Sequence, residues 1–236
     1  MTANRPFRGF RFLPDVILWA VRWYLQFAVS FRDLELMLAD RGVQVDHVTL
    51  YRWNQRFAPE IETRMRRHLR PCRGPWHVDE TYVRIGGGWR YLYRAVDGNG
   101  QTIDFLLSAK RDMQAARRFF RRALDRNNTR NPRTVITDRL GSYRGAIRAM
   151  KRDGELWRFA RHRRGQWLNN WVEQDHRRVK RRTDPMLGFK RFLTARRTIA
   201  GVEAMIMLRK GQVAAAPANN MPLQRAFIAS LFGLAA

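Results

Sequence analysis

Cysteine is almost absent from this chain of 236 residues, because Cys72 is the only one. A single thiol excludes an internal disulfide and any zinc site built from several cysteines. Long apolar runs are also missing, since none reaches the roughly 20 residues needed to span a bilayer. No signal peptide is visible at the start of the sequence. We therefore expect a cytoplasmic protein that has no membrane partner.

Acidic residues are scarce as well: 20 Asp and Glu face 46 Lys and Arg, which gives a net charge of +26. Repulsion of that size is tolerated most easily when a polyanion neutralises it, so nucleic acid is the expected partner. The excess is concentrated in residues 110–152 (+11) and 155–210 (+10), whereas residues 71–109 are neutral. A GC-rich genome would explain arginine in place of lysine, but not basic residues in place of acidic ones.

Residues 1–70 show the pattern of a helix-turn-helix module. Apolar periodicity predicts helices over 15–27, from Ser30 to Arg41-Gly42, and from Asp46 onward, followed by a charged connector helix over 59–70. The third helix carries polar residues that we expect to face the major groove of DNA: His47, Thr49, Arg52, Gln55 and Arg56. A plain three-helix bundle would share every apolar position, and the basic charge favours the DNA-binding reading.

Beyond Pro71 the hydrophobic period changes from that of helices to that of strands. Three strands joined by Gly-rich turns are expected over 76–85, 89–96 and 101–108, which form an antiparallel meander. The remaining elements are then a helix over 112–126, strands over 134–137 and 157–160, and helices over 143–152, 166–182 and 187–210. This order predicts a mixed α/β, ribonuclease-H-like domain over 71–212, with a central mixed sheet flanked by helices and a tail over 213–236.

Three acids in this basic half lie at positions where an acidic residue is unusual and suggests a function. Asp79 lies in the middle of a strand, Asp138 ends the next buried strand, and Glu173 lies in a helix crowded with arginine. Acids from two strands and a helix can converge, and their mutual repulsion then demands a cation. Oxygen ligands of this kind suit Mg²⁺, and a pair of such ions can promote an in-line phosphoryl displacement.

Each acid also has a simpler explanation. Asp79 could be a surface acid on an edge strand, and its neighbour Glu80 is an equal candidate by charge alone. Asp138 could begin a turn, and Glu173 could form a surface ion pair with Arg177 at i+4. Taken together, the three acids favour a metal site because of their spacing, with 34 residues between Asp138 and Glu173.

With that spacing, several stretches of the sequence resemble bacterial DDE transposases of insertion-sequence family six. The stretches are Trp76 to Tyr82, Tyr91 to Asp97, Thr137-Asp138, Asn169-Asn170 and Glu173 to Arg178. The resemblance extends over nearly the whole chain, and the motifs are specific in combination.

The resemblance implies that Asp79, Asp138 and Glu173 bind the catalytic metal, two Mg²⁺ or Mn²⁺ ions, and that Lys180 assists them by contacting a DNA phosphate. It implies an enzyme that binds the terminal inverted repeats of its element, cleaves DNA and joins it to target DNA. It also implies at least a dimer, a nucleoid-associated location and no small-molecule substrate. We expect Arg177, Arg178, Lys180 and Arg181 to contact phosphates. The alternatives are a catalytically silent DNA-binding regulator and a ribonuclease-H-type nuclease.

Overall fold

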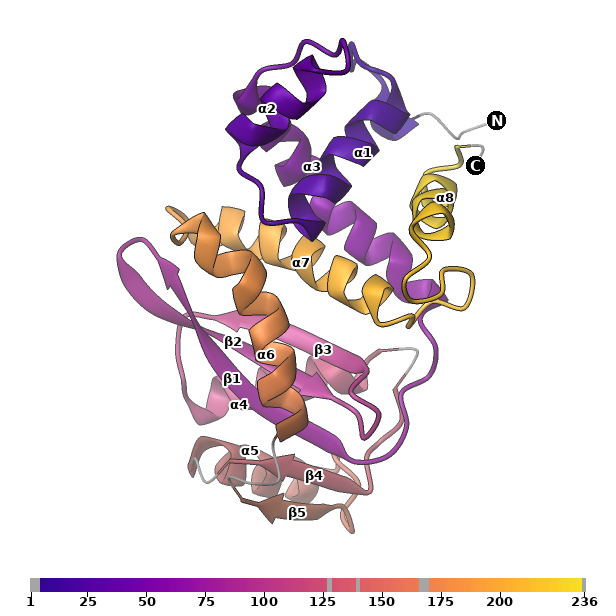
Figure 1. The fold of residues 1–236 in the computed structure, drawn as a ribbon. Coiled ribbons are helices and arrows are strands. Elements are labelled where there is room, and N and C mark those ends of the chain that lie inside the picture. Colours follow the sequence, from indigo (N-terminus) through magenta and orange to yellow (C-terminus); the bar gives the residue numbers. More distant parts are fainter. Residues whose placement is uncertain (1–4, 127–128, 139–140, 166–169, 235–236) are drawn as a thin grey trace. The chain divides into compact units, whose positions relative to one another are not determined.

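The computed structural model describes residues 5–126, 129–138, 141–165 and 170–234. It divides into two compact units: Met1–Leu69 with Arg181–Ala236, and Arg70–Lys180 (Figure 1). We call them the helical unit and the sheet unit. Asn169 and the first residues of the helix expected over 166–182 lie outside the described residues.

The helical unit begins with the three helices that the sequence predicts. They are α1 (Pro14–Gln26), α2 (Phe31–Ala39) and α3 (His47–Met65), with short 3-10 turns η1 (Arg5–Phe7) and η2 (Arg66–His68). Ser30 and Asp33 form a reciprocal capping box at the start of α2, and Asp46 caps α3. The connector helix is not separate, because α3 continues through Pro59 to Met65.

Two C-terminal helices complete the helical unit: α7 (Phe192–Arg209) and α8 (Met221–Leu231). A short 3-10 turn, η4 (Asp184–Met186), precedes α7. Gly201 of α7 lies so close to α1 and α3 that a Cβ there would be 2.6 Å from Leu25 Cδ1 and 2.7 Å from Ala58 Cβ. In the tail, Phe227 and Phe232 are buried. Residues 181–212 therefore pack with the N-terminal helices, whereas the functional division at 70/71 and 212/213 stays a prediction.

The sheet unit contains the mixed five-stranded sheet expected for a ribonuclease-H-like fold. Its strands are β1 (Trp76–Ile85), β2 (Gly88–Val96), β3 (Thr102–Ser108), β4 (Thr134–Thr137) and β5 (Arg161–Arg164). They lie in the order β3-β2-β1-β4-β5. The first three are antiparallel, and β4 is parallel to both β1 and β5 (Figure 1). The predicted mixed α/β class is confirmed.

The last strand differs from its prediction at 157–160. There the chain turns back on itself, with the Ala160 N–H donating to the Trp157 carbonyl at 2.9 Å. Pairing begins only at Arg161, whose N–H donates to the Arg133 carbonyl at 2.8 Å. The basic run that follows, rather than the aromatic segment, is therefore the strand.

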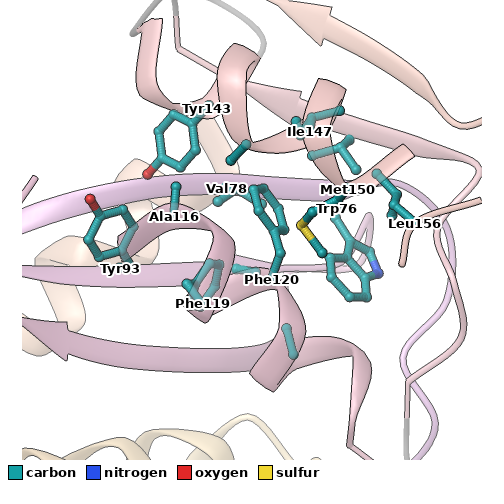
Figure 2. Close-up of a cluster of buried hydrophobic side chains, with 14 of the residues drawn as sticks. Trp76, Val78, Tyr93, Ala116, Phe119, Phe120, Tyr143, Ile147, Met150 and Leu156 are labelled. Atoms are coloured by element: carbon teal, nitrogen blue, oxygen red, sulfur yellow. The ribbon is translucent and has the colours of Figure 1, made fainter. Parts of the chain in front are cut away.

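One face of the sheet packs on α4 (Met113–Leu124) and α5 (Gly141–Arg152). Figure 2 shows the core between them, in which Trp76 and Val78 of β1 meet Phe119, Phe120 and Ile147. Figure 1 shows α6 (Asn170–Thr183) crossing the sheet, and its ion pair with Arg94 of β2 fixes the contact. The sheet is thus flanked by helices on both faces. Among the helices of the described residues, none is both long enough and apolar enough to cross a membrane.

Candidate functional site

Strand pairing brings Asp79 and Asp138 together. β1 and β4 run parallel, with Val78 opposite Thr137. Asp79 follows Val78 and Asp138 follows Thr137, so the two acids come next on neighbouring segments. Asp138 directly follows β4, at the carboxyl edge of that strand, where α/β folds commonly bind ligands. Two acids that are 59 positions apart (138 − 79) in the chain therefore become neighbours.

A third carboxylate, Glu80, lies beside them. One oxygen each of Asp79, Glu80 and Asp138 lie within 4.8 Å of one another. Both oxygens of Glu80 already have partners, because the Tyr143 hydroxyl donates to Oε2 and the Arg111 guanidinium pairs with Oε1. The Glu80 side chain is only 1% exposed. Glu80 is therefore held by protein donors at both of its oxygens.

Asp79 and Glu80 leave the strand on opposite faces, as successive residues do. Glu80 is opposite Tyr93, a member of the core under α4 and α5, whereas Asp79 is opposite Arg94. Since cross-strand partners share a face, Asp79 and Arg94 both lie on the face that α6 covers. The face of Asp79 is therefore also the face nearest to Glu173.

Glu173 lies in the first turn of α6 and is exposed. His176, one turn later on the same side of the helix, has its Nδ1 at 3.9 Å from Asp79 Oδ2. Glu173 is also near enough to Asp79 for its charge to contribute to the raised pKa of that carboxyl. The Glu173 oxygens are not part of the group within 4.8 Å, so the structure brings Glu173 to the edge of the site.

The electrostatics of the cluster favour a bound cation. Burial, together with repulsion from the charges of Glu80, Asp138 and Glu173, raises the pKa of Asp79 to about 7. Burial, together with the charge of Arg94, lowers the pKa of His176 to about 3, so this imidazole is neutral at pH 7. A divalent ion would relieve the repulsion, and carboxylate oxygens are the donors that Mg²⁺ and Mn²⁺ prefer. The residues present therefore fit a divalent metal.

Arg111 and Tyr143 were not predicted from the sequence. The Arg111 guanidinium is 3.9 Å from Asp138 Oδ2 and donates to the Tyr82 hydroxyl at 3.2 Å, besides its pairing with Glu80. Arg111 is one of many arginines and is separated from Glu80 by 31 positions, so composition and spacing give no signal for it. Only the fold identifies it as the arginine beside the acids.

Four basic residues of α6 are on the surface. Arg177, Arg178, Lys180 and Arg181 are exposed. Lys180 lies seven residues after Glu173, which puts both on one side of the helix. Its charge also reaches His176, since it contributes to the lowered pKa of that imidazole. These positions are accessible to a phosphate backbone.

The residues that the sequence predicted to contact DNA from a helix-turn-helix divide into two groups. Arg52 and Arg56 are exposed on α3, and His47 and Thr49 are half-buried near its start. Thr49 also contributes to the cap, because its Oγ1 donates to Asp46 Oδ2 at 2.7 Å.

Gln55, which the sequence predicted to face the DNA groove, is instead buried at 8% exposure. Its Nε2 donates to Thr198 Oγ1 of α7 at 2.9 Å. The correction has a simple cause: α7 covers the side of α3 that a three-helix module would leave open.

Comparisons with known proteins identify relatives of this chain. A family described as "DDE domain" (DDE_Tnp_IS240) matches residues 74–212. The chain is 38% identical over 208 residues to the "Transposase for insertion sequence element IS257 in transposon Tn4003" of Staphylococcus aureus, covering 86% of this chain and 88% of that one. It is 37% identical, with the same coverage, to the "Transposase for insertion sequence-like element IS431mec" of S. aureus strain Mu50.

A solved structure, the simian T-cell lymphotropic virus intasome in complex with a PP2A regulatory subunit, is similar over 48% of this chain and 40% of that one. The identity is 18% and the TM-score 0.39.

Proposed function

The chain belongs to the DDE-domain transposases of insertion sequences, and we propose that Asp79, Asp138 and Glu173 form its catalytic metal site. It is a metal-dependent polynucleotidyl transferase that acts on DNA. The observation that carries the proposal is the pairing of β1 with β4, which makes neighbours of Asp79 and Asp138 on the sheet. The raised pKa of Asp79, about 7, supports a cation at this point.

The DDE domain implies a divalent metal, and we assign two Mg²⁺ or Mn²⁺ ions to this site. When bound, the metal would activate the attacking oxygen and stabilise the leaving oxygen of an in-line displacement. Asp79 and Asp138 supply ligands from the sheet, and Glu173 supplies one from α6. Glu80 is the less suitable third ligand, because Arg111 and Tyr143 occupy its oxygens. This contrast supports Glu173 over Glu80 as the third ligand.

The remaining residues of the site would orient DNA. Lys180 lies on the same side of α6 as Glu173 and is suited to hold a phosphate beside the metal. Arg177, Arg178 and Arg181 extend the basic surface. In the helical unit, we assign recognition of the terminal inverted repeats to His47, Thr49, Arg52 and Arg56. Gln55 is assigned to the packing of α3 on α7.

The proposed reaction has two steps. Water first attacks a phosphodiester at the element end and releases a 3′ hydroxyl. That hydroxyl then attacks a phosphodiester of the target. A new phosphodiester bond joins the element end to the target, and the 3′ oxygen of the target strand is displaced as a hydroxyl. Because two element ends are joined to one target, we propose that the enzyme acts as a dimer or higher oligomer, on the nucleoid in the cytoplasm.

A strand-transfer assay with labelled element ends tests the proposal. The parent is expected to give joined products in Mg²⁺ or Mn²⁺, and Asp138→Asn, which keeps the side-chain size but removes the charge, is expected to give none. Binding to the terminal repeats should be unchanged in the variant. Equal product from both proteins would contradict the metal site, whereas repeat binding without any product from the parent would indicate a silent regulator.

A further inference from the structure

A buried ion pair joins α6 to the sheet next to the proposed site. Arg94 Nη2 lies 2.7 Å from Asp175 Oδ2, and the two side chains are 0% and 4% exposed. Arg94 comes from β2, and Asp175 comes from the first half of α6. Both residues belong to the sequence stretches that carry the family resemblance, yet the proposed chemistry uses neither.

Such a pair is a poor means of stabilising a fold. Removing two charges from water is costly, and well-packed apolar residues of similar size are often equally or more stabilising. A buried pair does, however, favour one geometry, because separating the two side chains loses the attraction that offsets the cost of burying both charges. The pair is therefore better suited to fix a position than to add stability.

Its position relates it to two of the proposed metal ligands. Arg94 is the cross-strand neighbour of Asp79, and Asp175 follows Glu173 by two residues. The apolar contacts of α6, Val172 and Val179, are buried along one stripe of the helix. A stripe of that kind tolerates a small rotation of the helix about its axis, whereas a charge pair does not.

We infer that Arg94 and Asp175 are positioning residues that set the rotation of α6 and thereby the place of Glu173 relative to Asp79. The inference rests on the proposed function. If α6 rotated by one residue, or about 100°, His176 would leave Asp79 and Glu173 would turn away with it. The ion pair holds the helix in the orientation that keeps Glu173 on the same side as Asp79.

The experiment measures Mn²⁺ affinity by electron paramagnetic resonance on the full-length protein, together with thermal unfolding without metal. The main variant is Arg94→Met/Asp175→Leu, which replaces the pair with apolar side chains. The matched control is Arg122→Met/Asp104→Leu. That pair joins α4 to β3 at 3.0 Å, with Asp104 0% exposed, and Asp104 is opposite Ala95 of the core under α4 and α5. Asp138→Asn serves as the reference without a site.

We expect the main variant to unfold at or near the parent temperature but to bind Mn²⁺ about 10–100-fold more weakly, the usual effect of losing an outer-shell partner. The control pair should leave Mn²⁺ affinity unchanged. Parental affinity in the main variant would overturn the positioning role while leaving the proposed function intact. A parent that binds no more Mn²⁺ than Asp138→Asn would overturn both.

A conservative variant covers the case in which the main variant does not fold. Asp175→Glu keeps the charge and lengthens the side chain by one methylene, so the pair can form only if α6 shifts. We expect a folded protein whose Mn²⁺ affinity falls about tenfold or more. Unchanged affinity in Asp175→Glu would again overturn the inference.

Discussion

The Asp79 carboxylate is repelled by neighbouring acidic side chains, and a bound cation would relieve this repulsion. Its folded pKa of about 7 lies above the value of 3.8 for a free aspartate. An acid whose pKa is raised on folding binds its proton more tightly in the native state, so its contribution to stability falls as pH rises from about 4 to about 7. Above pH 7 the charged carboxylate destabilises the metal-free protein.

We therefore predict that Asp79→Asn stabilises the metal-free protein at pH 8, by about 1–4 kcal/mol, and has little effect at pH 4. Thermal unfolding of parent and variant across this pH range measures the difference directly. Addition of Mn²⁺ should stabilise the parent alone. A variant less stable than the parent at pH 8 would show that the carboxylate is already compensated by protein groups.

The two tyrosines beside Glu80 offer a matched comparison. Figure 2 shows the phenol oxygens of Tyr93 and Tyr143 at the same end of the core. The Tyr143 hydroxyl donates to Glu80, whereas the Tyr93 hydroxyl is buried without a hydrogen-bond partner in the described part of the chain. Tyr143→Phe should cost about 1.5–3 kcal/mol, as expected for a bond to a charged group. Tyr93→Phe should be neutral or stabilising. Urea unfolding measures both variants, and a larger loss of stability in Tyr93→Phe than in Tyr143→Phe would contradict the prediction.

Among the elements, α7 comes close to α1 and α3 at Gly201. Gly201→Ala would place a methyl 2.6–2.8 Å from Leu25 and Ala58 side-chain atoms, so overpacking of about 1–3 kcal/mol should exceed the helix preference of alanine. Gly145→Ala in α5 is the control, because the new methyl meets only the flexible Met113 side chain, with Sδ at 2.9 Å. We expect urea unfolding to show destabilisation by Gly201→Ala and none by Gly145→Ala. Stabilisation by both variants would mean that α7 packs less tightly against α1 and α3 than these distances indicate.

Elements with local signals could be predicted from the sequence. The strand at 76–85 alternates in hydrophobicity, and Ser30 and Asp46 cap their helices as expected. Asp79 and Asp138 could also be selected, because an acid in a strand interior and one at a strand end are unusual there.

The features that could not be predicted depend on distant segments. Gln55 is buried by Thr198, a residue 143 positions later in the chain. Glu80 is paired with Arg111 and accepts a hydrogen bond from Tyr143, and both partners come from outside its strand. Strand β5 is a basic run whose pairing with β4, rather than its hydrophobic pattern, makes it a strand. Periodicity and composition carry no information on such contacts.

At the scale of the whole molecule, the net charge of +26 predicts binding that is steeply dependent on salt. The two basic surfaces should differ in kind. Arg52→Ala on α3 should reduce the preference for terminal repeats over random duplex, because base contacts specify sequence. Arg177→Ala on α6 should weaken binding to both DNAs equally and lower the salt slope by about one. Gel-shift titrations at several salt concentrations separate these outcomes, and equal effects of both variants would remove the division of roles.

We propose that Glu173, and not Glu80, completes the metal site with Asp79 and Asp138. Strand transfer by Glu173→Gln and Glu80→Gln, compared in Mn²⁺ with folding verified by circular dichroism, tests it most directly. We predict that Glu173→Gln loses more than about 100-fold of the product, while Glu80→Gln, whose amide oxygen can still accept from Tyr143, joins DNA at a reduced but measurable rate. Parental activity in Glu173→Gln would contradict the account.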